Sequence, residues 1–230
     1  DMFINYAKQY SDMPFVIMLD EDENGYKAGR FLRASDLGMS GENNEWKPVI
    51  QDKLSQQLLV PNGTMGQRWE EGKKWNLKLE TEDGTPIDPM LSMAESDYHV
   101  DTIQFPYFDS SGDGIFERPI ATRTIQLANG EKVKIATVYD LMTSQYGVQR
   151  FEHELEATSY DDASSKYTPA WQEQITGIKK ELVTKVAKEF AQNAIDTGGR
   201  SMIIMGAGIN HWFNSCLLYT SDAADEEDSV

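Results

Sequence analysis

The sequence predicts an α/β fold in which amphipathic helices pack on a partial β-sheet, together with a β-hairpin and long irregular insertions. Three patterns indicate this fold class. A short apolar run at Pro14–Leu19 is typical of a buried strand. Apolar residues alternate with polar ones on both sides of Asn129-Gly130, and an apolar stripe recurs at three- and four-residue spacing between residues 178 and 194.

The first residues of the chain are predicted to form a helix that leads directly into a strand. This strand is PFVIML, Pro14–Leu19, and the acidic stretch after it ends at Asn24-Gly25. Asn-Gly favours a tight turn because both residues tolerate a positive φ. We therefore expect a second strand to pair with the first after this turn.

A long polar segment follows, and it is predicted to be largely irregular. Glycine, asparagine and proline interrupt residues 38–84, and Trp46, Trp69 and Trp75 are spread through them. Large rings in a polar segment suggest a surface excursion that the tryptophans hold in place. Residues 80–101 show no sustained period, so we expect an irregular loop there and treat residues 38–120 as largely an insertion.

The clearest local pattern is a β-hairpin over Thr122–Val138. Apolar and polar residues alternate up to Asn129-Gly130, and the alternation resumes at Val133. This pattern predicts two strands joined by a primed two-residue turn. Tyr139–Tyr146 is then predicted to be a short helix that ends at Gly147.

Two helices and a buried strand are predicted between Pro169 and residue 215. Pro169 suits the start of a short helix, PAWQEQI, and a longer amphipathic helix follows Gly177 and ends at Gly198-Gly199. Ser201–Met205 (SMIIM) is expected to be a buried strand that runs into a glycine-rich loop. Residues 121–215 thus form the α/β part of the chain.

Composition excludes several classes of function. The chain has 230 residues, with 21 basic and 38 acidic side chains and a net charge of −17. Binding to a phosphate backbone requires clustered lysine and arginine, so nucleic acid is excluded as a partner. Cys216 is the sole cysteine, so the chain cannot by itself form a disulfide, a zinc–thiolate site or an iron–sulfur site. No run approaches the roughly 18 apolar residues of a membrane span.

Both ends of the sequence suggest a piece of a longer protein. The chain starts at Asp1 in a segment typical of the middle of a domain. The segment CLLYTSDAADE, from Cys216 to Glu226, resembles the translation of a sequencing adapter. We therefore interpret residues 216–230 as a non-native tail, with a true acidic tail as the alternative.

The candidate binding loop follows the predicted strand Ser201–Met205. Open α/β sheets place ligands at the carboxyl ends of strands, where glycines let the backbone approach closely. Gly206, Gly208, Asn210 and His211 supply backbone amides, an amide side chain and an imidazole on one loop. The alternatives are a tight structural turn and a structural histidine, because the full dinucleotide fingerprint is missing.

Two stretches resemble calcium-binding loops in part. The first has Asp20, Asp22, Asn24 and Gly25, but Phe31 stands where the bidentate glutamate belongs. The second has Asp109, Ser111, Asp113 and Gly114, with Ile120 at the closing position. Polar turns explain both, and a calcium-binding or acidic interaction module remains the alternative from a different class. No nucleophile, zinc or phosphate-loop motif occurs, so we assign no catalytic residue and no metal ligand.

Several segments together resemble the catalytic alpha subunits of respiratory nitrate reductases, which are molybdopterin oxidoreductases of the DMSO reductase family. The resemblance runs in order through nearly all of residues 11–215. The segments that carry it are SDMPFVIML, VPNGT, KWNL, FPYF, LANGE, TVYDLM, TSYDD, YTPAWQEQITGI and GRSMIIMGAGINHW. By this resemblance residues 1–215 are part of a molybdopterin oxidoreductase domain.

The resemblance implies a specific activity for the longer enzyme. It implies reduction of nitrate to nitrite with quinol-derived electrons, a molybdenum held by two molybdopterin guanine dinucleotides, and a 4Fe-4S cluster. It further implies an iron–sulfur beta subunit and a membrane cytochrome b gamma subunit, with the enzyme on the cytoplasmic face of the membrane. Gly206, Gly208, Asn210 and His211 correspond to the pterin-side loop. Nitrite oxidoreductase or another related molybdenum enzyme is the alternative, and the isolated chain is expected to bind no metal and to be inactive.

Overall fold

The structure is a computed structural model that describes residues 2–23, 25–74, 76–106 and 115–204. The chain divides into two compact units, Asp1–Thr184 and Lys185–Val230. Each unit is described separately below.

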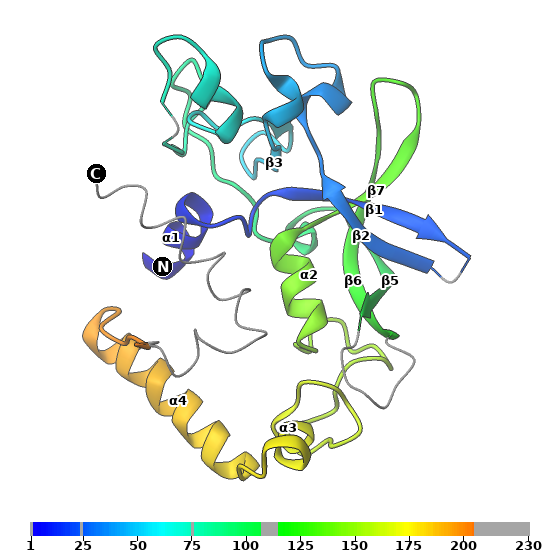
Figure 1. Ribbon diagram of the computed structural model, residues 1–230, viewed down its shortest axis with the longest axis vertical. Coiled ribbons are helices and arrows are strands. Elements are labelled where there is room, and N and C mark those ends of the chain that lie inside the picture. The colour runs from blue at the N-terminus through cyan, green and yellow to red at the C-terminus, as the bar shows by residue number, and fades with distance from the viewer. Residues whose placement is uncertain (1, 24, 75, 107–114, 205–230) are drawn as a thin grey trace. The chain divides into compact units, whose positions relative to one another are not determined.

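Strands β1, β2, β5, β6 and β7 of the first unit form a closed barrel in that order (Figure 1). Their bounds are Val16–Asp22, Gly25–Phe31, His99–Pro106, Ile115–Gln126 and Lys132–Thr137. β1 pairs antiparallel with β2, which confirms the strand pair predicted around Asn24-Gly25. β7 pairs with β1 and closes the ring. The contact between β2 and β5 is parallel and short, and it joins Tyr26 to Ile103.

The barrel carries apolar clusters on both faces of its strands. Met18 and Ile135 belong to one cluster of buried residues. Their neighbours in sequence, Leu19 and Ala136, belong to a second. Successive side chains of a strand point to opposite faces, so each strand contributes to both clusters.

β5 places a charged residue on the same side as part of the apolar core. Asp101 accepts hydrogen bonds from the Thr122 hydroxyl and the Lys134 ammonium group, and that ammonium lies 4.8 Å from the centroid of the Tyr26 ring. The carboxylate is therefore neutralised inside the sheet. The structure differs here from the expected irregular loop, because residues 99–101 already belong to a strand.

The hairpin between β6 and β7 forms as predicted, but its turn differs. Gln126 pairs with Lys132, the Leu127 amide donates to the Glu131 carbonyl at 2.8 Å, and the Gly130 amide donates to the Leu127 carbonyl at 2.9 Å. Only Gly130 of the Asn129-Gly130 pair has a positive φ, of 88°. A primed two-residue turn needs two positive φ angles, so this connection is a three-residue loop with a left-handed glycine.

The segment between β2 and β5 is mostly irregular and packs against the barrel. It contains the 3-10 helices Ala34–Leu37, Asn44–Trp46, Met65–Trp69 and Met93–Glu95 and the short strands β3, Ile50–Gln51, and β4, Leu58–Leu59. Trp46 and Trp69 contact each other with ring centroids 5.7 Å apart, whereas Trp75 lies outside the described residues. Val49 and Met93 of this segment lie fully buried in the first apolar cluster.

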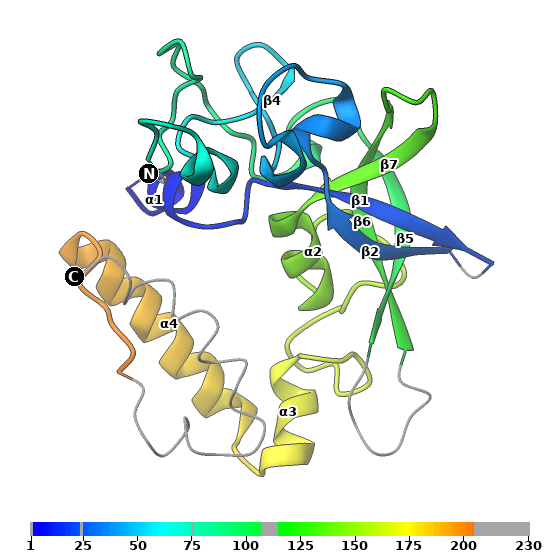
Figure 2. The ribbon, with the colours of Figure 1, turned by 45° about the horizontal axis from the view of Figure 1, so that its top comes forward.

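Three helices of the first unit agree with the predictions. They are α1, Met2–Tyr10, α2, Val138–Gln145, and α3, Pro169–Thr176. Figure 2 shows α1 beside the irregular segment, where the Gln9 side chain donates to the Leu77 carbonyl at 3.2 Å. Leu141 of α2 and Trp171 of α3 pack on the second apolar cluster, so amphipathic helices do cover the sheet.

Helix α4, Lys180–Thr197, begins in the first unit and continues into the second. It ends at Gly198 and Gly199, whose φ angles are 68° and 97°, as the sequence predicts. Residues 201–204 do not form the expected strand. The Ser201 hydroxyl instead donates to the Phe190 carbonyl at 3.0 Å and accepts from the Asn193 amide group at 2.8 Å, which folds the chain back on the last turns of α4.

Candidate functional site

The loop predicted to bind a cofactor lies just beyond the described part of the chain. Gly206, Gly208, Asn210 and His211 all fall outside the described residues, as does the predicted tail at residues 216–230. Ile204 is the last described residue, and it precedes this loop. The assignment of these four residues therefore stays a prediction.

Two of the segments that carry the family resemblance contact each other in the fold. Gly63 of VPNGT has a φ of 80°, and a Cβ atom added to it would lie 1.8 Å from the carbonyl oxygen of Asn76 in KWNL. The Asn62 carbonyl accepts from the Lys78 amide at 2.8 Å, and the Asn62 amide donates to the Glu80 carbonyl at the same distance. Only glycine permits this approach of two backbones. The residues of both segments are therefore needed for the way the two backbones pack together.

The segments TSYDD and YTPAWQEQITGI also lie together. Asp162 accepts from the amide and hydroxyl of Ser164 at 3.0 and 2.6 Å. Thr168 caps α3 by accepting from the Trp171 amide at 3.1 Å, and it donates to the Asp162 carbonyl at 2.6 Å. These contacts connect the acidic loop to the start of the helix.

Arg118 of β6 holds the same loop from the barrel side. Its guanidinium donates to the carbonyls of Leu155 and Lys166, at 3.1 and 3.2 Å, and to the Ser165 hydroxyl at 3.2 Å. Burial lowers the pKa of Arg118, and the charges of Tyr167 and Asp162 act in the opposite direction. The contacts are to neutral groups, so the arginine positions the loop rather than forming an ion pair there.

A buried charge cluster joins α2 to the irregular segment. The Asp140 carboxylate, in TVYDLM, accepts from the hydroxyls of Ser92 and Thr137 and from the Met93 amide, at 2.6, 2.9 and 2.8 Å. Arg150 donates to the same carboxylate at 2.8 Å. Every oxygen of Asp140 has a partner, so this cluster stabilises the fold and offers no free group for chemistry.

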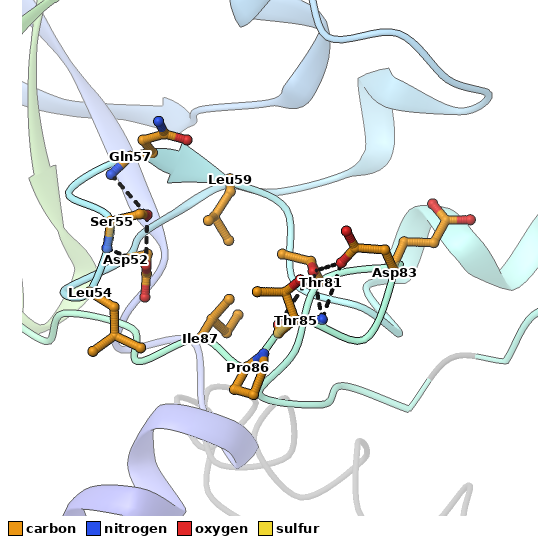
Figure 3. A pocket seen from close by; sticks show the side chains of 11 residues that line it. Asp52, Leu54, Ser55, Gln57, Leu59, Thr81, Asp83, Thr85, Pro86 and Ile87 are labelled. Carbon is orange, nitrogen blue, oxygen red and sulfur yellow. Dashed lines mark hydrogen bonds between the residues drawn. The ribbon is translucent and has the colours of Figure 1, made fainter.

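A further feature that could bind a ligand is a cleft of about 650 Å³, which we call the Asp52 cleft (Figure 3). Leu54, Leu59, Pro86 and Ile87 form its apolar surface. The other lining residues are Asp52, Ser55, Gln57, Thr81, Glu82, Asp83 and Thr85.

Asp52 is the buried charged residue of this cleft. Only 2% of it is exposed. Burial opposes its ionisation, but hydrogen bonds from the Ser55 hydroxyl and from the amides of Asp88, Ser55 and Leu54 outweigh that effect and hold the pKa of Asp52 below its usual range. The cleft therefore carries a permanent negative charge at neutral pH.

The sequence analysis missed this cleft. Its walls come from residues 52–59 and 81–87, two aperiodic segments that only the fold brings together. The spacing of Asp52 and Ser55 is one available signal, because aspartate commonly accepts hydrogen bonds from residues just after it in a turn.

The first calcium-like stretch lies in a pair of β-strands. Asp20 lies in β1, and Asp22 pairs with Gly25 across the β1–β2 ladder, so strands replace the helices that flank a calcium loop. Asp109, Ser111, Asp113 and Gly114 lie outside the described residues, and so does Asn24. In the residues that are described, no three histidine, cysteine, aspartate or glutamate side chains gather into a group that could hold a metal ion.

The sequence is similar to known proteins over nearly its whole length. No protein-family model matches it. The chain is 50% identical over 220 residues to the nitrate reductase alpha chain of Bacillus subtilis (strain 168), in an alignment that covers 95% of this chain. It is 41% identical over 231 residues to the respiratory nitrate reductase 1 alpha chain of Escherichia coli (strain K12), which covers 94% of this chain. Over 227 residues and 95% of the chain, it is 40% identical to the nitrate reductase alpha subunit of Mycobacterium tuberculosis (strain ATCC 25618 / H37Rv).

The match covers only part of each relative. The chain spans 18% of the length of each of these three relatives. None of the helices within the described residues is long and apolar enough to cross a membrane. Since the identity extends over nearly the whole chain, the chain is similar along its length to one segment of the nitrate reductase alpha chains.

Proposed function

We propose that this chain is part of the catalytic subunit of a respiratory nitrate reductase, which reduces nitrate to nitrite with electrons derived from quinol. The supporting observation is the 50% identity to the Bacillus subtilis alpha chain over 95% of this chain. Because Gly63 and Asn76 lie in contact, two of the resembling segments depend on each other for their structure. Identity over 95% of the chain supports a shared role in the longer protein.

The proposed chemistry belongs to a cofactor. A molybdenum held by two molybdopterin guanine dinucleotides would transfer the oxygen atom, with a 4Fe-4S cluster to relay electrons. We assign this chain a binding role at Gly206, Gly208, Asn210 and His211. Glycine amides and the polar side chains of Asn210 and His211 can donate hydrogen bonds to a pterin and so orient it. We assign no metal ligand to the described residues, where no suitable cluster occurs.

We propose an iron–sulfur beta subunit and a membrane cytochrome b gamma subunit as partners of the complete enzyme. These partners would hold it at the cytoplasmic face of the membrane. The relatives are named as alpha chains or alpha subunits, which supports membership of a multi-subunit enzyme.

A chimaera tests the proposed activity. Residues 1–215 of this chain replace the aligned segment of the Bacillus subtilis alpha chain, and the chimaera is co-expressed with its host subunits. We expect nitrite to form when reduced viologen is oxidised in the presence of nitrate. An assembled chimaera that contains molybdenum but reduces no nitrate would contradict the proposal.

The binding loop has a separate test in the same chimaera. We expect Asn210→Ala and His211→Ala to lower the pterin content, measured by fluorescence of the oxidised pterin after its release. His99→Ala, at an exposed histidine of β5, serves as the control and should leave the content unchanged. Full pterin content in both loop variants would refute the loop assignment while leaving the nitrate result intact.

A further inference from the structure

We infer that the Asp52 cleft is a docking site for a lysine-bearing segment of a partner polypeptide, which inserts aliphatic stems against Leu54, Leu59 and Ile87 and places ammonium groups beside Asp52 and Asp83. This inference goes beyond the proposed function, since it concerns a different part of the chain.

The apolar surface of the cleft extends to the outside of the molecule. Ile87 is buried at the base, whereas 70% of Leu54 is exposed. In Figure 3 the side chains of Leu54, Leu59, Pro86 and Ile87 gather between the two loops. An exposed leucine that continues a concave apolar surface is typical of a contact with another protein.

The charges of the cleft have a single sign. Asp52, Glu82 and Asp83 line it, and no lysine, arginine or histidine is among the described lining residues. Glu82 forms an ion pair with Lys73, outside the cleft. Asp83 accepts from the Thr81 hydroxyl and, at 3.1 Å, from the Thr85 amide, and these neutral donors lower its pKa without cancelling its charge.

Asp52 adds a negative charge, and its hydrogen-bond donors among the described residues carry no positive charge. Its carboxylate accepts from the Ser55 amide and hydroxyl, both at 2.7 Å, and from the Asp88 amide at 2.8 Å. All of these donors are neutral. A buried carboxylate held by neutral donors keeps an attractive field for a cation at the cleft.

The apolar surface and the negative charge of the cleft together favour lysine as the partner side chain. Lysine carries a long aliphatic stem that covers apolar surface and an ammonium group at its end. Acidic segments and phosphate groups are repelled by Asp52 and Asp83. Purely aliphatic segments would supply no positive charge to balance Asp52 and Asp83.

Two peptides test this inference on the full chain. One is an acetylated and amidated pentapeptide of alternating leucine and lysine, and the other has glutamate in place of lysine. Methyl NMR spectra report the resonances of Leu54, Leu59 and Ile87 during titration. We expect the lysine peptide to shift these resonances and to bind at least about fivefold more tightly than the glutamate peptide.

Variants show whether the charges are responsible. Asp52→Asn and Asp83→Asn should each reduce the preference for lysine, and Glu154→Gln, which removes an exposed negative charge elsewhere, should not. If Asp52→Asn unfolds the turn that it holds, Asp83→Asn still tests whether the charge of the cleft sets the preference. Equal binding of both peptides, shifts confined to other methyl groups, or an unchanged preference in Asp83→Asn would each overturn the inference.

Discussion

The Asp140 carboxylate, which has no exposed surface, lies 2.8 Å from the Nη1 atom of Arg150. The pair connects α2 with the chain that follows it. Ser92 adds a contact from the irregular segment, since its hydroxyl donates to Asp140. Three parts of the first unit thus meet at one buried charge.

Removal of one partner of this pair should destabilise the fold strongly. We expect Asp140→Asn to lower the free energy of unfolding by about 3 kcal/mol, because it leaves the Arg150 charge without its carboxylate. Denaturant unfolding measures the change. Glu154→Gln is the control and should stay within about 0.5 kcal/mol of the parent chain.

A double-mutant cycle separates the pair from its surroundings. Arg150→Met alone should also destabilise the chain, and the double variant should lose less than the sum of the two single losses. Additive losses would show that Asp140 and Arg150 do not act together.

Gly63 and Gly84 form a matched test of the close backbone approach. Both have a positive φ, of 80° and 84°, but no atom lies within 4 Å of a Cβ added at Gly84. Gly84→Ala should therefore cost only the left-handed strain, about 1 kcal/mol. Gly63→Ala should cost about 1–3 kcal/mol more, because its Cβ meets the Asn76 carbonyl. Equal losses in thermal unfolding would refute the contact.

Asp52 should make stability depend on pH. Its pKa is lowered in the folded chain, so its contribution is present above the unfolded pKa of about 3.9 and is lost as pH falls through the folded value. We expect the parent chain to lose more free energy of unfolding than Asp52→Asn between pH 6 and about pH 3. Other carboxyl groups titrate in both proteins, so identical losses would mean that Asp52 contributes nothing.

Thr168 should contribute to stability as the cap of α3. Its hydroxyl accepts from the Trp171 amide, so Thr168→Ala should lower the free energy of unfolding by about 1 kcal/mol. Thr168→Ser keeps the hydroxyl and should recover most of this loss. A serine variant as unstable as the alanine variant would assign the effect to the buried methyl group instead.

Local patterns were sufficient to predict most helices and one hairpin. Gly147, Gly177 and Gly198 all have positive φ and stand where the sequence ends its helices. The turn of the hairpin was harder, because Asn129-Gly130 suits two loop lengths. The backbone bonds of Leu127 and Glu131 decide between them.

Long-range contacts explain what the sequence did not reveal. Asp101 interrupts the apolar alternation of β5, and its partner Lys134 lies on β7. The parallel contact between Tyr26 and Ile103 closes the barrel without any local signal. Similarly, the Asp52 cleft needs two loops that have no common pattern. The predicted strand after α4 failed because Ser201 bonds back to Phe190 and Asn193.

Barrel closure through β2 and β5 has a consequence for the order of folding. The β6–β7 hairpin joins neighbours through a three-residue loop and can form early, since little chain entropy is lost. Tyr26 and Ile103 meet only after the whole irregular segment has been drawn into a loop. We expect this parallel contact to form late, so that mutations at Tyr26 mainly accelerate unfolding while mutations in β6 and β7 slow refolding.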